Sequence, residues 1–305
     1  MLVEAWNVEH NQMHHYCLGE DADPDLVEQN FARFRDMPLP YLAKRVVVAL
    51  MALTWKWYYY APNTFKQLKI HELRRKGKVP THSDGTPVTE QQVLGPWPIS
   101  YEWFLKAGPV FFTNAEFFLR VLGPFFLRQF IVIPALVGMC LGRTAAFNTC
   151  VSFILADLLT NAHSFLVIVT NHAGDDLYRF ERHCEARSAT YYLRQVVSSV
   201  NFRTADSCGG PASFGGDLND FHHGWLNYQI EHHLWPDLSM LSYQKSAPLL
   251  KAICKKHNVP YIQESVFWRL KKTTDIIAGD ASMRKFPAKW ENEPDLSPLD
   301  RNTMG

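Results

Sequence analysis

The stretch NYQIEHHLWP, Asn227–Pro236, places two adjacent histidines behind a glutamine and in front of bulky apolar residues. Gln229 precedes His232 by three positions and His233 by four, so all three share one face if the segment is helical. Imidazole nitrogens suit iron, zinc or copper, and a glutamine carbonyl oxygen can coordinate a metal or accept a hydrogen bond from metal-bound water. The stretch therefore predicts part of a metal site beside an apolar surface.

Two other motifs concentrate histidines. HNQMHH carries His10, His14 and His15, and NHAGDD carries His172. On an α-helix His10 and His14 lie about 40° apart, and His15 lies about 100° from His14. Two of them can therefore address one metal while the third turns toward a second. Together with the first motif, they predict one histidine-rich metal centre.

Six nearby acids and six other histidines have separate expected roles. Ligand histidines need an acceptor on their other ring nitrogen, and the candidates near in the sequence are Glu9, Asp21, Asp23, Asp175, Asp176 and Glu231. Four histidines have no partner at ligand spacing and are expected on the surface: His71, His82, His183 and His257. His222 and His223 are either ligands or structural and surface residues, and the second interpretation is favoured.

The composition narrows the class of protein. The chain has 305 residues, is 47% hydrophobic and carries a formal net charge of +1, so no charge bias points to nucleic acid as a partner. Its six cysteines are scattered, without a C-x-x-C pair. This pattern argues against a disulfide framework or a zinc knot and suits a reducing compartment.

Three apolar stretches follow the first histidine cluster: Ala43–Ala61, Pro124–Gly142 and Phe147–Asn171. The last two would be helices about 28 and 37 Å long, enough to cross a bilayer. Only four residues separate them, so they predict a transmembrane hairpin at about 124–171. The first stretch contains lysines and an arginine and ends in WKWYYY, which is typical of the headgroup level. An interfacial or re-entrant segment is favoured there over a third crossing.

Charge predicts the orientation of the hairpin. The basic segment Lys66–Lys78 is expected in the cytoplasm by the positive-inside rule. The hairpin then returns the chain to the cytoplasm after Asn171, so that all three histidine clusters lie on that side. Asp157 and His163 fall inside the last span, where they mark either a functional site or a helix–helix hydrogen bond, for instance to Arg128.

These motifs resemble those of the membrane fatty acid desaturases with histidine boxes. QIEHHLWP is similar to the third box of the front-end type, in which glutamine replaces the first histidine. HNQMHH is similar to the second box, with the spacing H-x-x-x-H-H in place of the usual H-x-x-H-H. His172 resembles the lone histidine between these two boxes. The resemblance runs from about Trp6 to Tyr261.

The resemblance implies a di-iron centre at the cytoplasmic face, four transmembrane helices and oxygen-dependent insertion of a double bond into a lipid acyl chain. It implies the endoplasmic reticulum membrane as the location. The chain has no H-P-G-G haem motif, so electrons are expected from a separate donor such as cytochrome b5 or ferredoxin. The implied iron ligands are His10, His14, His15, His172, His232 and His233, with Gln229 as a further ligand or a holder of water.

The family's first box, H-x-x-x-H, has no separate counterpart in this sequence. Only nine residues precede His10, and the pair His10 and His14 already belongs to the second box. We therefore expect residues 1–305 alone not to desaturate lipid. Four bulky residues around the third box either line the mouth of an acyl slot or pack in the core, and packing is favoured: Trp225, Tyr228, Leu234 and Trp235.

The sequence thus predicts an all-α integral membrane protein, with a transmembrane hairpin and a cytoplasmic helical cap that carries the histidine boxes. A desaturase domain is expected over residues 1–279, with an amphipathic helix within Ser242–Tyr261, and a polar tail over residues 280–305. The predicted function is acyl desaturation. A di-iron lipid hydroxylase and a truncated, non-catalytic membrane protein with a partial metal site are the alternatives.

Overall fold

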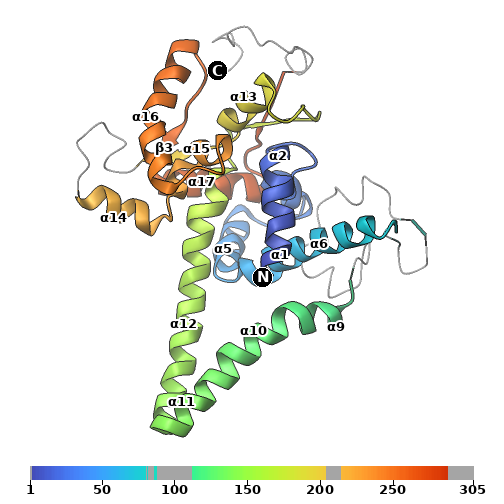
Figure 1. Ribbon diagram of the computed structural model, residues 1–305, viewed down its shortest axis with the longest axis vertical. Helices are drawn as coiled ribbons and strands as arrows, with labels where there is room; N and C mark the ends of the chain where they lie inside the picture. Colours follow the sequence, from blue (N-terminus) through green and yellow to red (C-terminus); the bar gives the residue numbers. More distant parts are fainter. Residues whose placement is uncertain (1, 80, 82–85, 88–111, 204–213, 288–305) are drawn as a thin grey trace. The chain divides into compact units, whose positions relative to one another are not determined.

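The computed structural model describes residues 2–79, 81, 86–87, 112–203 and 214–287, which are mostly helical (Figure 1). The chain divides into two compact units. Unit 1 comprises Met1–Gln12 and Leu42–Phe165, and unit 2 comprises Met13–Tyr41 and Leu166–Gly305. The predicted metal ligands are therefore distributed over both units, and most of them belong to unit 2.

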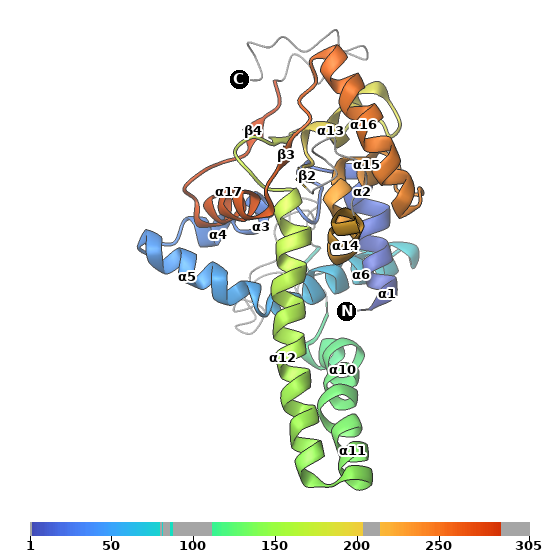
Figure 2. The same cartoon turned by 90° about the vertical axis from the view of Figure 1, so that its left-hand side faces the viewer.

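The predicted hairpin is the longest feature of unit 1. Its first arm, Asn114–Leu141, is built from α9 (Asn114–Phe117), η3 (Phe118–Leu122), α10 (Gly123–Leu127), η4 (Arg128–Val132) and α11 (Ile133–Leu141). The second arm is α12 (Arg143–Ile168), which adjoins α11 at the turn (Figure 2). From the turn the two arms diverge toward α9 (Figure 1). By length and composition, each arm can cross a membrane, and only 6% of the apolar window of the first and 22% of that of the second is buried.

Two local features set the limits of this hairpin. The first arm begins at Asn114 because the Thr113 hydroxyl caps it, accepting a hydrogen bond from the Glu116 N–H at 3.1 Å. Gly142 alone makes the turn, with φ of 90°, a conformation that favours glycine. The sequence correctly indicated two long apolar helices. It was wrong about the start of the first, which lies ten residues before Pro124, and about the four-residue connection.

The first apolar stretch is not one continuous helix. It forms α5 (Tyr41–Ala52), breaks at Leu53 and Thr54, and continues as the π-helix η2 (Lys56–Tyr60) and then α6 (Ala61–Arg75). Among the described residues, only the two hairpin arms meet the length and composition of a membrane span. The exposed side chains of α5 include Leu42, Val46 and Leu50, which follow one another at helical spacing. The interfacial placement of this stretch stays a prediction.

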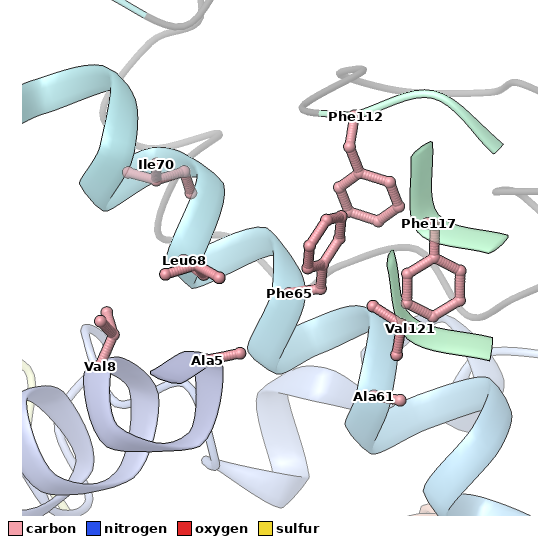
Figure 3. Close-up of a cluster of buried hydrophobic side chains, with 9 residues drawn as sticks. All are labelled: Ala5, Val8, Ala61, Phe65, Leu68, Ile70, Phe112, Phe117 and Val121. Atoms are coloured by element: carbon pink, nitrogen blue, oxygen red, sulfur yellow. The ribbon is translucent and has the colours of Figure 1, made fainter. Parts of the chain in front are cut away.

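An aromatic cluster forms the core of unit 1 (Figure 3). The rings of Phe65, Phe112 and Phe117 lie with centroids 4.9 to 5.6 Å apart, within the range that aromatic pairs prefer. Ala5 of α1 (Val3–Trp6) and Val8 pack against the same cluster. Burying a phenylalanine side chain contributes about 1.5–3 kcal/mol, so this cluster fixes the helix that leads into the first histidine motif.

Unit 2 is a set of short helices joined by minimal strands. Its helices after η1 (Asn7–His14) are α2 (His15–Cys17), α3 (Val27–Asn30), α4 (Ala32–Arg35), η5 (Val169–Asn171), α13 (Ala189–Val197), α14 (Phe214–His222), η7 (Leu226–Tyr228), α15 (Gln229–Leu234), α16 (Met240–His257) and α17 (Val266–Ala278). Helix α16 overlaps the helix expected at Ser242–Tyr261, but it begins two residues earlier and ends at His257.

Two parallel ladders of two residues each interrupt the all-helical pattern of unit 2. Strand β1 (Tyr178–Arg179) pairs with β4 (Arg284–Lys285), and β2 (Asn201–Phe202) pairs with β3 (Gln263–Glu264). The segment expected to form a tail from residue 280 thus begins with a packed stretch that includes β4. Phe286 is buried there with Tyr178 and Phe180, and residues 288–305 lie outside the described part of the chain.

Candidate metal centre

Three buried histidines from three different segments of unit 2 meet at one point. His14 ends η1, His172 follows η5 at the end of the hairpin, and His233 lies in α15. They are 2%, 9% and 0% exposed, and their ring centroids lie 4.7 to 5.0 Å apart. One nitrogen from each lies within 4.8 Å of the others. These three side chains form a group that can hold a metal ion.

The local sequence explains how α15 presents its histidines. Trp225 adopts a left-handed conformation (φ 58°) and reverses the chain before η7 and α15. The helix ends at Leu234 because Trp235 precedes Pro236, which disfavours helical backbone at the residue before it. Helical spacing then places His233 one turn after Gln229, on the face that points to His172.

Asp23 orients His14. The His14 Nδ1 atom lies 2.8 Å from Asp23 Oδ1, and the same carboxylate accepts the backbone N–H groups of Gly19 and Asp25 at 2.9 Å. Burial opposes protonation of His14. The charge and the hydrogen bond of Asp23 outweigh this effect of burial and raise the pKa of His14. With Nδ1 engaged by the carboxylate, Nε2 is the nitrogen left for a metal. Asp23 is one of the six acids proposed for this role from the sequence.

His232 and His233 are held neutral. Burial lowers the pKa of His232 to about 4, and it lowers that of His233 well below the usual value, helped by the neighbouring imidazoles. A neutral imidazole keeps a lone pair for a metal ion. At neutral pH these two side chains are therefore in the protonation state that ligation requires.

Gln229 lies at the centre of this group. Its amide nitrogen is 2.9 Å from His172 Nε2 and 3.1 Å from His233 Nε2, and its amide oxygen accepts a hydrogen bond from Asn171 Nδ2 at 3.3 Å. The two Nε2 atoms are 3.2 Å apart. The sequence predicted Gln229 beside the histidines, and the structure places it there with its nitrogen, not its oxygen, toward the imidazoles.

His15 and His232 form a second pair beside the first group. Their ring centroids are 4.7 Å apart, and His15 also stacks on His233 at 4.6 Å, where α2 and α15 adjoin (Figure 1). His14 also contacts His172 and His15 also contacts His232, while both rings contact His233. His232 Nδ1 lies 3.3 Å from the Tyr243 hydroxyl of α16. No sequence motif predicted Tyr243 at this position.

Glu231 is bound away from the histidines. Its two carboxylate oxygens accept hydrogen bonds from Asn201 Nδ2 and from the Tyr261 hydroxyl, both at 2.8 Å. Asn201 in turn accepts the Ile230 N–H at 2.9 Å. Helix α15 is thereby fixed to strand β2 and the segment before β3. Glu231 supports the site by positioning the helix, not by contacting an imidazole.

The remaining predicted ligand, His10, belongs to unit 1. It lies in η1, where its ring stacks on Trp6 with a centroid distance of 4.5 Å and its Nδ1 is 2.9 Å from Asn11 Oδ1. The sequence predicted an α-helix here, whereas Asn7–His14 is a π-helix, a form often found at functional sites. The role of His10 as a ligand stays a prediction.

Other histidines fall into the expected classes with one exception. His71, His222 and His257 are exposed, and His223 bonds its own helix through the Asn219 carbonyl at 2.8 Å. His82 lies outside the described residues. The exception is His183, which was expected to lack a partner. Its Nδ1 is 2.8 Å from Glu20 Oε2, a contact between residues 163 positions apart.

Asp157 within the second hairpin arm has a partner that the sequence did not indicate. It contacts Lys56 Nζ and Trp57 Nε1, each at 2.7 Å, and not Arg128. His163 is exposed. Asp157 therefore ties η2 to the hairpin, which favours the structural interpretation over a functional one.

Most of the bulky residues around the third motif pack in hydrophobic clusters. Tyr228 and Leu234 are buried in hydrophobic clusters, and Trp225 packs against the cluster of Tyr228. Trp235 is 40% exposed. No side chain of this set is left to line a slot except Trp235.

The donor set fits iron. Imidazole nitrogen is a favoured donor for iron, zinc and copper. Three imidazoles converge here from separate segments, with a carboxylate behind one of them and a second histidine pair alongside. His233 Nδ1 is buried and, among the described residues, has no hydrogen-bond partner. These features are those of a ligand cluster rather than of a satisfied polar core.

Comparisons with known proteins place the chain in a family. Residues 1–265 match the family model for fatty acid desaturase. The chain is 29% identical over 168 residues to fatty acid desaturase 2-like protein FADS2B of Mus musculus, which covers 55% of this chain and 28% of that protein. It is 26% identical over 196 residues to NADPH-dependent stearoyl-CoA 9-desaturase of Mycobacterium tuberculosis, covering 59% of this chain and 43% of that protein.

A shorter match with a higher identity is to acyl-lipid (9-3)-desaturase of Borago officinalis. The identity is 48% over 42 residues, which is 14% of this chain and 9% of that protein. The chain thus spans less than half the length of each of these relatives. No solved structure matches the chain.

Proposed function

The chain belongs to the fatty acid desaturase family, and from this premise we propose that it carries the metal centre of an oxygen-dependent acyl desaturase. The observation that carries the proposal is the convergence of His14, His172 and His233 on one buried point, with Gln229 against two of them. The proposed ligands of a di-iron centre are His10, His14, His15, His172, His232 and His233.

Iron with oxygen supplies the oxidising power to remove hydrogen from an unactivated C–H bond, which acid–base side chains lack. The protein's own part is to hold the ligands and exclude water. Asp23 fixes the tautomer and ring orientation of His14, while Glu231 and Asn201 hold α15 at its place on β2. The burial of the central histidines keeps bulk water away from the reacting atoms.

Gln229 is proposed as the adjustable member of the site. Its amide nitrogen faces the Nε2 atoms of His172 and His233, and a metal bound at these atoms would displace this donor. Rotation of the amide would turn its oxygen toward the metal, either as a weak ligand or as an acceptor for water. This role distinguishes Gln229 from the histidines, whose nitrogens are needed in every state of the site.

We further propose a membrane lipid acyl chain or acyl thioester as substrate and a separate electron donor such as cytochrome b5 or ferredoxin. Supporting this are the two apolar arms with exposed apolar surface and the acyl substrates that the relatives' names print. The proposed location is the endoplasmic reticulum membrane, with the histidine clusters on the cytoplasmic side, as the basic segment around Arg74 and Arg75 indicates.

Lipid profiling after expression tests the proposal. Residues 1–305 would be expressed alone and also fused behind the segment of a relative that contains the first histidine box. Each of the two forms would be made with and without His233→Ala. We expect a new double bond in the fused form, none from residues 1–305 alone, and none with His233→Ala. A hydroxylated product from the fused form would indicate the hydroxylase alternative. No oxidised product despite bound iron would favour a non-catalytic protein with a partial metal site.

A further inference from the structure

A second cluster of metal-ligating side chains lies in unit 2, formed by residues that the metal centre described above does not use. Cys17, Glu20 and His183 each offer one ligand atom, and these atoms lie within 4.8 Å of one another. Glu20 is 3% exposed, whereas the His183 side chain is 67% exposed. The cluster therefore has a buried carboxylate at its base and an opening to solvent.

The backbone around this cluster is fixed. Glu20 forms a bridge with Phe180, and the Phe180 N–H donates to the Gly19 carbonyl at 2.8 Å. Gly19 has φ of 72°, and a Cβ there would lie 3.1 Å from the Tyr178 carbonyl oxygen. Glycine is therefore required at this crossing of two segments. The pairing holds Cys17 and Glu20 next to His183 in the folded chain.

The two oxygens of Glu20 have different partners. Oε1 accepts hydrogen bonds from the buried Arg194 guanidinium at 2.9 Å and from the Cys184 N–H at 3.2 Å. Oε2 faces His183 Nδ1 at 2.8 Å. A rival interpretation is that Glu20 serves only to neutralise Arg194. That role uses Oε1 and explains neither the histidine at Oε2 nor the thiol beside it.

We propose that Cys17, Glu20 and His183 form a zinc site distinct from the histidine centre. Thiolate, imidazole and carboxylate are the donors that zinc uses in proteins, and three protein ligands with an open fourth position is a common arrangement. Tetrahedral zinc bonds of this length place the ligand atoms about 3.3–3.6 Å from one another. The three ligand atoms here lie within 4.8 Å of one another, so small side-chain adjustments bring them to one ion.

Zinc binding would replace the hydrogen bond between His183 Nδ1 and Glu20 Oε2 with bonds from each side chain to the ion. It would also release the proton of the Cys17 thiol to solvent, because a thiol that coordinates a metal is deprotonated. Water enters through the exposed side of His183 and fills the fourth position.

Cobalt substitution tests this site separately from the histidine centre. Co²⁺ bound to a thiolate gives a ligand-to-metal charge-transfer absorption that an all-histidine site cannot give. The full chain, purified in detergent and titrated with Co²⁺, is expected to show this absorption, and Zn²⁺ is expected to remove it. Cys17→Ser should abolish it, and His183→Ala should weaken Co²⁺ binding at least about tenfold. Cys140→Ser, at an exposed thiol of α11, is the matched control and should leave it unchanged.

The readout does not depend on the proposed function. His233→Ala removes a ligand of the histidine centre and is expected to keep the cobalt–thiolate absorption in full. Because His183 is exposed, its replacement leaves the fold intact, so loss of affinity there reports on the site itself. Absence of the absorption in the unaltered chain would overturn the proposal. Unchanged absorption in Cys17→Ser, or unchanged affinity in His183→Ala, would overturn it as well.

Discussion

The hairpin of unit 1 and the histidine-bearing segments of unit 2 accommodate polar groups in opposite ways. The hairpin exposes apolar side chains along both arms, and its Asp157 is paired with Lys56. Unit 2 buries many polar and charged side chains, each set in a specific contact, among them Arg194, Arg269 and Glu231. A repeated apolar pattern forms the first structure, whereas pairwise contacts between distant residues form the second.

The difference predicts where substitutions do most damage. A lipid-facing apolar position tolerates change because its surroundings are uniform and fluid. A buried charged position does not, because removing one partner leaves the other without compensation.

Arg269→Ala is expected to destabilise the protein most. The fully buried Arg269 guanidinium contacts both oxygens of Asp176 at 2.7 and 2.8 Å and the Ala173 carbonyl at 2.9 Å, directly after His172. Breaking such a pair costs about 3–5 kcal/mol. Denaturant titration in detergent measures the free energy of unfolding. A loss no larger than that of a surface substitution would show that unit 2 does not depend on its buried pairs.

Asp176 predicts a pH dependence of stability. Burial opposes its ionisation, but Arg269 and Lys272 outweigh burial and lower its pKa. A lowered folded-state pKa contributes stability that is fully present above the usual aspartate pKa and is lost as the pH falls through the folded value. Asp176→Asn should therefore be less stable than the unaltered chain at neutral pH, and the gap should close in acid. A gap that is constant down to strongly acidic pH would contradict the pairing.

Asp157→Asn tests the polar contacts of the hairpin. The substitution removes the charge that holds Lys56 while keeping a group that can accept from Trp57. Because such contacts in a membrane contribute about 1–2 kcal/mol at most, the loss should be smaller than that of Arg269→Ala. The same denaturant titration measures it. A loss of stability as large as that of Arg269→Ala, or larger, would contradict this expectation. It would show that the contact between Asp157 and Lys56 matters as much as the buried pairs of unit 2.

Leu159→Ala should have the smallest effect. Leu159 lies in α12 and is 70% exposed, so little packing is lost. We expect a change within about 0.5 kcal/mol. A larger loss would show that this face of the hairpin packs against another protein surface and not against lipid or detergent.

The sequence predicted the two kinds of region unequally. The hairpin followed from its apolar runs, but its start at Asn114 depends on the Thr113 cap and its turn on Gly142 alone. Neither of these residues changes the average hydropathy, which is the quantity that predicts a membrane span from a sequence. The histidine motifs named His14, His172 and His233 as candidates, but these residues lie on three separate segments, and only the fold brings them together.

Contacts between distant residues were not predictable in this way. Glu20 and His183 are 163 positions apart, and Lys56 and Asp157 are 101 apart. No periodicity or motif relates residues at such separations. Asp23 was one of six candidate acids, and only the folded chain distinguishes it from the others.

The iron content of the purified chain tests the central claim most directly. The unaltered chain should bind about two irons, as a di-iron histidine site requires. His233→Ala should lose most of this iron, because its nitrogen lies at the centre of the cluster. His257→Ala, at an exposed histidine of α16, should bind as much as the unaltered chain. An iron-free unaltered chain, or equal iron in His233→Ala and His257→Ala, would contradict the account.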